Sequence, residues 1–420
     1  MDDFMEYGLI GERLGHSFSQ PIHQQLAGYD YQLRPLSREE FPAFMEARDF
    51  RGINVTIPYK QAVIPYLDRL DSRAQAIGAV NTIVKEPDGS LTGYNTDYDG
   101  FLYLVRHLDL AFEGKKVLLL GSGGTCRTAA AVARDLGAAQ VLVASRSGRD
   151  GCLSYEDAME QPGVNLLVNV SPAGMYPDNG GCLVDLDRFP ALEGVVDVVY
   201  NPLATRLVLE AQRRGIPAAG GLRMLVGQAK AAAELFTGRP IEDSRMEEIY
   251  RRLKISLTSP VLVGMPSAGK TTVGRLMAKE LNREFLDLDA LLEQEAGKPI
   301  RQIFAEEGEA AFRRMERDLC ARVTKRGGPV IATGGGIVKD RENWFSLRQN
   351  GVVLWLDRPL DTLEVDPNRP LSCSREALAQ MREERLPLYE GCSDGKIDNA
   401  QDQDRAARTA TDFFIRLAGR

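Results

Sequence analysis

Eight consecutive residues in the second half of the chain have the types and spacing that hold a nucleotide phosphate. The run Gly264-Met265-Pro266-Ser267-Ala268-Gly269-Lys270-Thr271 is a complete G-x-x-x-x-G-K-[ST] sequence. An apolar run precedes it and a helical pattern follows it, which is the strand–loop–helix setting that this motif requires. Backbone N–H groups of such a loop cradle the phosphates, the lysine reaches the β- and γ-phosphates, and the threonine ligates Mg²⁺. The sequence therefore predicts a site for ATP or GTP with Mg²⁺ and leaves the phosphate acceptor open.

A second glycine-rich turn, at 121–124, lies in the first half of the chain. It follows an apolar run at 117–120 and precedes a helical pattern at 129–136. Glycine at such a turn lets the backbone approach a pyrophosphate, and the N-terminus of the following helix supplies N–H donors. The spacing is G-x-G-G rather than the full G-x-G-x-x-G, so a strand–helix turn without a ligand remains the alternative.

The residues after the next apolar run bear on the choice of dinucleotide. That run ends at Ala144-Ser145-Arg146-Ser147, where an NAD site expects an acidic residue for the ribose 2′-hydroxyl. Arg146 and the nearby Arg149 would instead suit a 2′-phosphate, so NADP is favoured over NAD. Two exposed surface arginines are the other interpretation of the same residues.

Short apolar runs alternate with helical patterns along nearly the whole chain, and these elements must position the loops. Strands buried on both faces appear as continuous apolar runs, and helices between them indicate parallel βαβ units. The predicted strands are 117–120, 141–144, 166–170, 195–199, 261–264, 330–332 and 352–356. The fold class is therefore α/β.

The main domain boundary is predicted near 238–259. Gly238-Arg239-Pro240 is a break, one amphipathic helix follows, and Thr258-Ser259-Pro260 ends that helix before a new strand at Val261. The linker should be only a few residues long. A weaker boundary near 95–100 separates the part with glycine-rich turns from the residues before it.

Composition excludes several classes of protein. The chain has 420 residues, of which 44% are hydrophobic and 26% charged, and its net charge is -7. This length allows two to four domains, and no basic surplus indicates a nucleic-acid partner. The N-terminus lacks a signal-peptide pattern and no run of 18 apolar residues exists, so neither secretion nor a membrane span is expected. Six scattered cysteines and three histidines favour free thiols in the cytoplasm and no zinc site.

A series of short blocks before residue 252 resembles, in order, the signature blocks of the shikimate dehydrogenase family. The blocks are His16-Ser17-Phe18-Ser19, Asn54-Val55-Thr56-Ile57-Pro58-Tyr59-Lys60, Gly78-Ala79-Val80-Asn81-Thr82, Asn95-Thr96-Asp97, Asn169-Val170-Ser171-Pro172-Ala173-Gly174-Met175, Tyr200-Asn201-Pro202 and Met224-Leu225-Val226-Gly227-Gln228. The resemblance implies one domain over 1–252. It would comprise an α/β substrate subdomain at about 1–99 with C-terminal helices at 228–252, and a Rossmann NADP-binding subdomain at about 100–227.

The same resemblance implies roles for individual residues. The substrate's carboxylate and hydroxyls would be held by Ser17, Ser19, Thr56, Asn81, Tyr200 and Gln228, and NADP by Gly121, Ser122, Gly123, Gly124, Thr125, Ser145, Arg146 and Gly221. Lys60 and Asp97 would be the catalytic pair, because an ammonium beside a ketone oxygen stabilises its developing charge and donates a proton, while a carboxylate orients the ammonium. His16 and His23 are interpreted as structural or rim residues.

Blocks after residue 258 resemble shikimate kinase, which implies a P-loop kinase domain with a parallel sheet over 258–420. Besides the phosphate loop they are Phe285-Leu286-Asp287-Leu288-Asp289, taken as the end of a strand, Gly308-Glu309-Ala310-Ala311-Phe312-Arg313, Thr333-Gly334-Gly335-Gly336, Arg369-Pro370-Leu371 and Glu384-Arg385-Leu386-Pro387-Leu388-Tyr389. ATP would be bound by Ser267, Ala268, Gly269, Lys270, Thr271, Thr272 and, from a lid, Arg369. Asp289 would contact the accepting hydroxyl and help to deprotonate it, with Lys270 as the second catalytic group.

Further kinase roles follow from the same resemblance. Arg313 and Arg385 would clamp the substrate carboxylate, and Gly335 and Gly336 would allow close backbone approach. Thr271 would ligate Mg²⁺, and Asp287 would support it through water.

The chain departs from both family patterns at a few places. Gln20 precedes Pro21 where proline is expected directly, Ser145-Arg146-Ser147 replaces Asn-Arg-Thr, and Gly220 stands where aspartate is common. The segment 358–368 is shorter than usual and lacks an arginine towards the adenine. We therefore expect weak ATP binding with loose base selectivity.

The combined interpretation is a bifunctional enzyme that reduces 3-dehydroshikimate with NADPH and then phosphorylates shikimate with ATP. Its partners would be small molecules, with a homodimer left open. One alternative is a quinate/shikimate dehydrogenase that uses NAD. The other is a second half that only binds nucleotide, as a regulatory or assembly module.

Overall fold

The computed structural model describes residues 4–15, 18–364, 374–400 and 402–419. The chain forms two compact units, Met1–Asn201 with Thr205–Tyr250, and Pro202–Ala204 with Arg251–Arg420. In the described part of the chain, no helix combines the length and apolar character that crossing a membrane demands.

The first unit begins with a mixed six-stranded sheet in the order β2-β1-β3-β5-β6-β4. Its elements are β1 (Met5–Gly11), α1 (Ser19–Ala27), β2 (Tyr31–Pro35), α2 (Glu40–Ala47), β3 (Phe50–Val55), β4 (Arg69–Leu70), α3 (Ser72–Ile77), β5 (Thr82–Lys85) and β6 (Leu91–Tyr94). β2, β1 and β3 are parallel, whereas β5 is antiparallel to both β3 and β6. Because alternate side chains point to opposite faces, the two faces of this sheet contribute to separate cores.

A parallel five-stranded sheet in the order β11-β10-β9-β7-β8 follows in the same unit. Its elements are β7 (Lys116–Leu120), α5 (Gly124–Asp135), β8 (Gln140–Ala144), α6 (Tyr155–Met159), β9 (Leu166–Asn169), β10 (Gly194–Asp197), α7 (Arg206–Arg213) and β11 (Ala218–Ala219). The chain enters at β7, moves to β8 on one side and then to β9 on the other. This change of direction places the carboxyl end of β7 at the point where doubly wound sheets bind ligands.

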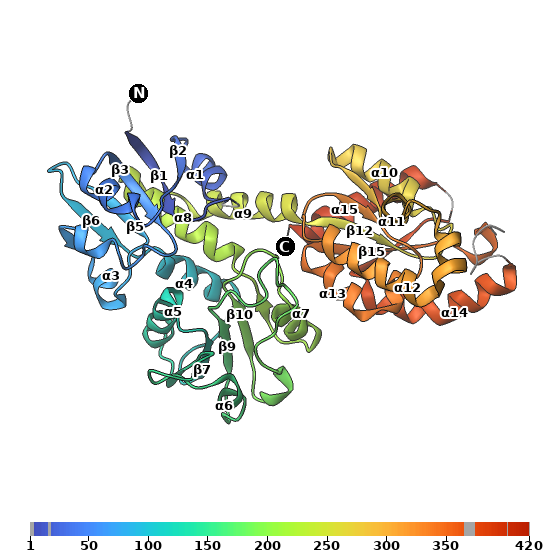
Figure 1. Ribbon diagram of the computed structural model, residues 1–420, viewed down its shortest axis with the longest axis horizontal. Coiled ribbons are helices and arrows are strands. Elements are labelled where there is room, and N and C mark those ends of the chain that lie inside the picture. Colours follow the sequence, from blue (N-terminus) through green and yellow to red (C-terminus); the bar gives the residue numbers. More distant parts are fainter. Residues whose placement is uncertain (1–3, 16–17, 365–373, 401, 420) are drawn as a thin grey trace. The chain divides into compact units, whose positions relative to one another are not determined.

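Two helices, α4 (Asp97–His107) and α8 (Leu222–Thr237), pack side by side in the first unit (Figure 1). Their closest approach needs glycine, because a Cβ atom at Gly100 would lie 2.4 Å from the carbonyl oxygen of Met224. The approach matters for function, since α4 carries Asp97 and α8 carries Gln228.

Helix α9 (Asp243–Leu257) spans the predicted domain boundary. Of the apolar residues Met246, Ile249, Tyr250 and Leu253, whose spacing predicts one amphipathic helix, Met246 and Ile249 are buried and the other two are partly exposed. Only Thr258 separates this helix from the next strand, so the link is shorter than the predicted few residues.

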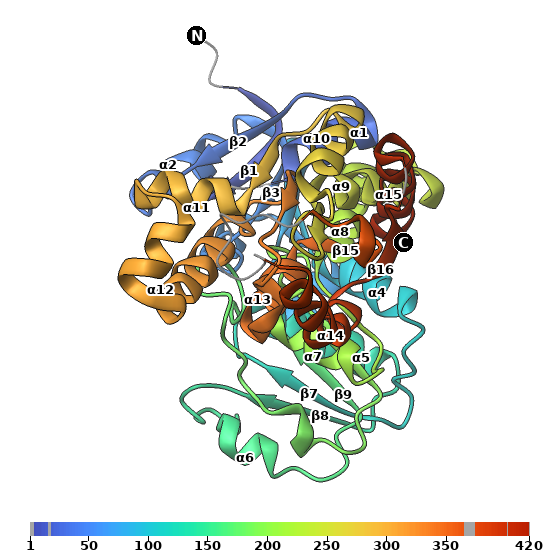
Figure 2. The same cartoon turned by 90° about the vertical axis from the view of Figure 1, so that its right-hand side faces the viewer.

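The second unit is built on a parallel sheet in the order β13-β14-β12-β15-β16. Its elements are β12 (Ser259–Val263), α10 (Lys270–Leu281), β13 (Phe285–Asp287), α11 (Leu288–Ala296), α12 (Ile300–Val323, interrupted at Gly308), β14 (Val330–Ala332), α13 (Arg341–Gln349), β15 (Gly351–Asp357), α14 (Arg375–Cys392), β16 (Gly395–Asp398) and α15 (Gln403–Ala418). Helices α10 and α15 lie side by side (Figure 2) and cover one face of the sheet, while α11 to α14 pack on the other.

All seven predicted strands are present and the α/β class is confirmed, although several strand ends differ from the prediction by one or two residues; β10, for example, ends at Asp197 rather than Val199. β12 begins at Ser259 rather than Val261, because Ser259 and Pro260 already pair with Gly351 and Val352 of β15 before the pairing with β14 starts at Val261. β13 ends at Asp287, not Asp289. The Asp287 side chain accepts the N–H groups of Asp289 and Ala290, so Asp289 lies in the first turn of α11.

Candidate active sites

Lys60 and Asp97 form a close ion pair in the first unit. Lys60 lies in the loop after β3, and Asp97 is the first residue of α4. The Lys60 Nζ atom lies 2.5 Å from Asp97 Oδ2, and their side chains are 19% and 5% exposed. The pair therefore leaves the ammonium partly accessible above a buried carboxylate, an arrangement that can donate a proton to a bound oxygen.

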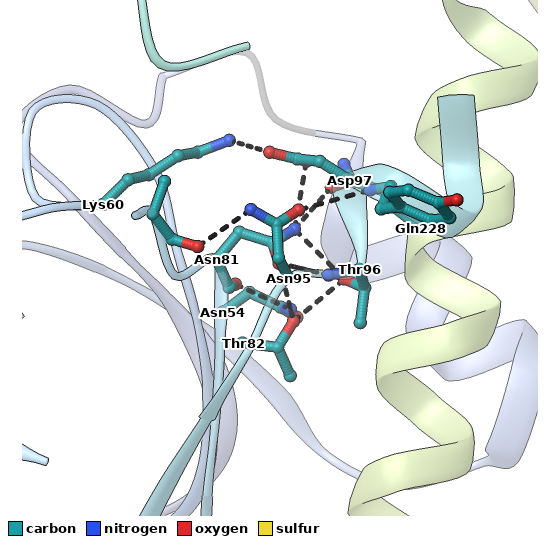
Figure 3. Close-up of polar contacts among 10 residues, drawn as sticks. Asn54, Lys60, Asn81, Thr82, Asn95, Thr96, Asp97 and Gln228 are labelled. Atoms are coloured by element: carbon teal, nitrogen blue, oxygen red, sulfur yellow. Dashed lines mark hydrogen bonds and ion pairs between the residues drawn. The ribbon is translucent and has the colours of Figure 1, made fainter. Parts of the chain in front are cut away.

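Asn81 organises the polar groups beneath this pair (Figure 3). Its Nδ2 donates to Asp97 Oδ1 at 3.0 Å and to Gln228 Oε1 at 3.1 Å. Its Oδ1 accepts the backbone N–H of Thr96 at 2.6 Å. Asn81 thus ties the strand β5 side of the site to the first turn of α4 and to α8, and it holds the orientation of the Asp97 carboxylate.

Four other residues of the quoted blocks, Asn54, Thr82, Asn95 and Thr96, form hydrogen bonds in or beside this network. Thr82 Oγ1 lies 2.9 Å from Thr96 Oγ1 and accepts from Asn54 Nδ2 at 2.9 Å. Asn95 Nδ2 donates to the carbonyl of Ala79 at 2.8 Å. These hydrogen bonds hold the backbone and side chains around the site in place. Only the position of the four residues inside the blocks could have identified them.

Three further proposed substrate residues, Ser19, Thr56 and Tyr200, lie on other segments of the first unit. Ser19 begins α1, and the preceding Phe18 ring lies 6.0 Å edge-on from the ring of Tyr200. Thr56 donates its backbone N–H to the Ile10 carbonyl at 3.0 Å, at the end of β1. Ser17 and His16 lie outside the described residues.

His23 is a core residue. Its ring stacks on Tyr31 at 4.0 Å, its Nδ1 lies 2.6 Å from the Tyr29 hydroxyl, and it is 2% exposed. Burial lowers the pKa of His23 to about 3, so the ring is neutral and unsuited to general-base work.

The glycine turn at 121–124 has room for a ligand. Gly121 has φ +118 and a Cβ atom there would lie 2.9 Å from the Ser171 Cβ atom, which explains why glycine is needed. At Gly123 and Gly124, by contrast, a Cβ atom would meet nothing within 4 Å. Helix α5 begins at Gly124, with Thr125 in its first turn, so its N–H groups face this space, as a pyrophosphate would require.

The segment after β8 carries the groups proposed for the 2′-phosphate. Ser145 is buried with its Oγ 3.4 Å from Ser147 Oγ, whereas Arg146 is exposed, as are Arg149 and, on the glycine turn, Ser122. No described residue forms an ion pair with Arg146 or Arg149. Both guanidinium groups thus remain available to an anion.

Gly221 and Asp197 are buried near the carboxyl end of β10. A Cβ atom at Gly221 would lie 2.1 Å from the carbonyl oxygen of Val198, so only glycine lets α8 begin here. Asp197 is fully buried and accepts from Asn169 Nδ2 at 3.0 Å and Thr205 Oγ1 at 2.6 Å. Burial raises the pKa of Asp197 to about 6. Sequence reasoning missed this residue, since an aspartate at a strand end is not distinctive.

The phosphate loop of the second unit has the expected setting between β12 and α10. Ser267 and Gly269 have φ values of +61 and +90, and Ala268 is buried. Lys270 Nζ donates to the carbonyl groups of Gly264 and Met265, both at 2.9 Å, which holds the ammonium across the loop. Thr272 follows in the first turn of α10.

Thr271 and Asp287 provide oxygen atoms suited to a hard cation. Thr271 Oγ1 donates to Asp287 Oδ2 at 2.7 Å, directly after the phosphate loop. Hydroxyl and carboxylate oxygens are the ligands that Mg²⁺ prefers. The residues present therefore fit this ion.

The glycine loop after β14 brings the proposed acceptor residues together. A Cβ atom at Gly334 would lie 2.5 Å from Asp289 Oδ1, one at Gly335 2.8 Å from Pro266, and one at Gly336 2.4 Å from Arg313 Nη2. Arg385 is 5% exposed, and its Nη1 donates to the Gly335 carbonyl at 2.9 Å. Asp289, Arg313 and Arg385 thus surround one backbone segment beside the phosphate loop. Arg369 lies outside the described residues.

Glu316 is a member of this site that the sequence did not reveal. It is 3% exposed, accepts from Arg313 Nη1 at 2.6 Å, and its Oε1 has no hydrogen-bond partner. Burial raises the pKa of Glu316, while Arg313 acts in the opposite direction. Its position one helical turn after Arg313 was the available signal.

Comparison with known proteins supports both halves. The family model for the shikimate dehydrogenase substrate binding domain matches residues 9–83, that for the shikimate 5'-dehydrogenase C-terminal domain matches 221–249, and that for shikimate kinase matches 266–414. Shikimate dehydrogenase (NADP(+)) of Clostridium perfringens is 35% identical over 266 residues, which cover 59% of this chain and 98% of that protein. The enzyme of the same name from Geobacter sp. is 38% identical, over 57% of this chain and 92% of its own length.

Solved structures agree with the first unit. The chorismate mutase/shikimate 5-dehydrogenase fusion protein of Clostridium acetobutylicum is 32% identical with a TM-score of 0.56, over 60% of this chain and 98% of that one. Shikimate 5-dehydrogenase of Thermus thermophilus, solved with NADP(H) and shikimate, is 33% identical with a TM-score of 0.53, over 59% and 99%. The chain therefore belongs to the shikimate dehydrogenase family and carries a shikimate kinase domain at its C-terminal side, so that it joins an oxidoreductase to a kinase.

Proposed function

We propose that residues 1–252 reduce 3-dehydroshikimate to shikimate with NADPH, and that residues 258–420 phosphorylate the hydroxyl so formed with ATP. The observation that carries the first reaction is the 2.5 Å pair of Lys60 and Asp97 above the Asn81 network. The second rests on the convergence of Asp289, Arg313 and Arg385 on the glycine loop beside the phosphate loop. The two reactions occur at the same carbon, which gives the fusion a chemical logic.

In the reduction, Lys60 would donate a proton to the ketone oxygen and stabilise its developing charge. Asp97 would keep the ammonium in place, because Asn81 fixes the other carboxylate oxygen. Ser17, Ser19, Thr56, Tyr200 and Gln228 would hold the carboxylate and hydroxyls of the substrate. NADPH, held by the glycine turn and the 145–146 segment, would supply the hydride.

In the phosphorylation, Asp289 would orient the accepting hydroxyl and take its proton. Arg313 and Arg385 would bind the substrate carboxylate, since guanidinium groups match its geometry. Lys270 and the loop N–H groups would neutralise the nucleotide phosphates, and Thr271 and Asp287 would hold Mg²⁺.

One incubation tests both assignments. The full-length protein is mixed with 3-dehydroshikimate, NADPH, ATP and Mg²⁺, and the products are identified by mass. We expect shikimate 3-phosphate; omission of ATP should stop the sequence at shikimate, and omission of NADPH should leave the substrate unchanged. Shikimate as the end product in the complete mixture would contradict the kinase half.

A second candidate for the first unit is a quinate/shikimate dehydrogenase that uses NAD. Quinate dehydrogenase of Corynebacterium glutamicum, solved with NAD, is 30% identical with a TM-score of 0.52, so the fold accommodates both substrates. The exposed Arg146 and the lack of an acidic residue at 145–147, directly after β8, favour NADP. Steady-state rates with both acids and both nicotinamides separate the two candidates.

A further inference from the structure

Arg358 is a partly buried arginine at the edge of the phosphate loop. It follows β15 directly, and its Nη1 donates to the carbonyl oxygen of Ser267 at 3.3 Å. Its Nε is buried and has no hydrogen-bond partner. Within the described residues no carboxylate forms an ion pair with it. Partial burial of a guanidinium group that has few hydrogen-bond acceptors and no ion pair costs free energy, unless a bound ligand supplies the acceptors and the negative charge.

The neighbouring carboxylates serve other groups. Asp357 accepts from Arg382 Nη1 at 3.2 Å and lies 2.7 Å from Lys396 Nζ. Asp398, which is paired with Asp357 in the sheet register, accepts the backbone N–H of Ala400 at 3.0 Å. Arg382 also donates to the backbone carbonyl of Arg358 at 3.0 Å, which fixes the start of that side chain. The end of β15 therefore carries a cation that the local acids do not neutralise.

The strand order places Arg358 away from the acceptor residues. β12 lies between β14 and β15, so the glycine loop after β14 borders the phosphate loop on one side and Arg358 borders it on the other. Asn399, just after β16, donates from Nδ2 to the Ala268 carbonyl at 2.7 Å on that second side. Arg358 consequently adds charge to the phosphate loop without taking part in recognition of the acceptor.

We infer that Arg358 binds the polyphosphate of the nucleotide. Guanidinium groups with unused N–H donors match phosphate oxygens, and the phosphate loop is the anion site within its reach. The inference deepens the proposed kinase function and rests on it. Because Arg358 would contact the phosphates and not the base, it should strengthen the binding of adenine nucleotides, guanine nucleotides and inorganic tripolyphosphate to a similar extent.

Calorimetric titration of the full-length protein tests this inference. ADP, GDP and tripolyphosphate are titrated, with Mg²⁺ and without shikimate, into the wild type, Arg358→Met, Arg358→Lys and the control Arg317→Met. Arg317 is a kinase arginine that is already paired with Asp340 at 3.2 Å. We expect Kd to rise about tenfold for all three ligands in Arg358→Met, as loss of one charge-assisted contact implies. Arg358→Lys should recover part of the loss, and Arg317→Met should match the wild type.

The dependence of Kd on salt concentration distinguishes a direct contact between Arg358 and the phosphates from a role in supporting the loop. The ratio of Kd values between Arg358→Met and wild type should shrink from about tenfold at roughly 0.02 M KCl to about threefold at roughly 0.5 M, because salt screens the lost contact. A salt-independent loss would overturn the inference, as would a Kd within about twofold of wild type. A loss for ADP without one for tripolyphosphate would also overturn it, by assigning Arg358 to the nucleoside. Failure of the wild type to bind any nucleotide would instead overturn the kinase proposal itself.

Discussion

The two active sites differ in how completely their buried polar groups are paired. Around Lys60, the carboxylate of Asp97 and both ends of the Asn81 amide have partners. Within the described residues, the first unit has one buried side-chain atom without a hydrogen-bond partner, Thr128 Oγ1, whereas the second has five: Glu316 Oε1, Asn343 Oδ1, Arg358 Nε, Arg385 Nε and Asn399 Oδ1. All of these five except Asn343 belong to residues at the phosphate loop or at the proposed acceptor clamp.

The difference follows from the two kinds of chemistry. Ketone reduction creates one negative charge, which the protein must meet with a group that is already oriented. Phosphoryl transfer brings several charges with its substrates, and most of the catalytic task is positioning them. We therefore expect the first site to be preorganised and the second to be completed by its ligands.

The largest effect should come from Lys60→Met. Loss of the oriented ammonium should reduce kcat for reduction about 10²- to 10³-fold. Shikimate phosphorylation should stay within about threefold, because distant sites act independently. Rates of both reactions in the same preparation, with circular dichroism to verify folding, provide the measurement. Loss of both activities in folded protein would contradict the proposal that the two sites act independently.

Lys270→Met is the reciprocal change. It removes the charge that lies across the phosphate loop and should lower phosphorylation about 10²-fold or more, since phosphate neutralisation is the main task of this site. NADPH-dependent reduction should remain unchanged. A fall in reduction to the same extent would show that the two sites are coupled.

The burial of Asp197 has a consequence for stability. Its pKa of about 6 lies above the usual value of 3.8 in the unfolded chain, so the folded state holds the proton more tightly. The tighter proton binding adds about 3 kcal/mol to the free energy of unfolding. This stabilisation is fully present below about pH 3.8 and is lost as the pH rises to about 6. Asp197→Asn should flatten that interval of the stability–pH profile. Denaturant unfolding at several pH values measures it, and an unchanged slope would contradict the assignment.

Glu316→Gln probes the less completely paired site. Without its charge, Glu316 should hold Arg313 less firmly, so KM for shikimate should rise about tenfold while KM for ATP changes little. Glu307→Gln is the control, because Glu307 lies in the part of α12 before the interruption at Gly308 and pairs with Lys298. Equal shifts in both KM values would indicate a general loss of packing instead of a weakened clamp.

The smallest expected effect concerns the cofactor. We predict that NADPH is preferred over NADH by at least about tenfold in kcat/KM, the size of one charge-assisted contact. Arg146→Gln should remove most of that preference by slowing the NADPH reaction alone. Equal kcat/KM values for the two nicotinamides in the wild type would refute the role of Arg146.

Much of the fold was predictable because it depends on local patterns. The seven apolar runs became strands, and the phosphate loop and the glycine turn at 121–124 lie between strand and helix as their residues require. Such motifs are determined by backbone geometry within about ten residues, so their spacing in the sequence carries the information. The errors at Ser259 and Asp289 were boundary errors, where pairing with β15 and the Asp287 cap decide the outcome.

The partners of the site residues could not be predicted in the same way. Asn81 meets Gln228, which lies 147 positions later in the chain, and Arg385 meets Gly335 50 positions earlier. Nothing in the local pattern distinguishes Arg358 from a solvated surface charge, and the spacing of Glu316 from Arg313 allows a pair without indicating that it is buried. Only the packing of α12 against the glycine loop buries Glu316, and only the order of β12 and β15 brings Arg358 to the phosphate loop.

The sequence by itself determined which loops have the form that binds phosphate, since those contacts are made by backbone groups in sequence order. The tertiary structure decided which charged side chains lie beside those loops, because desolvation and pairing depend on neighbours that are distant in the chain.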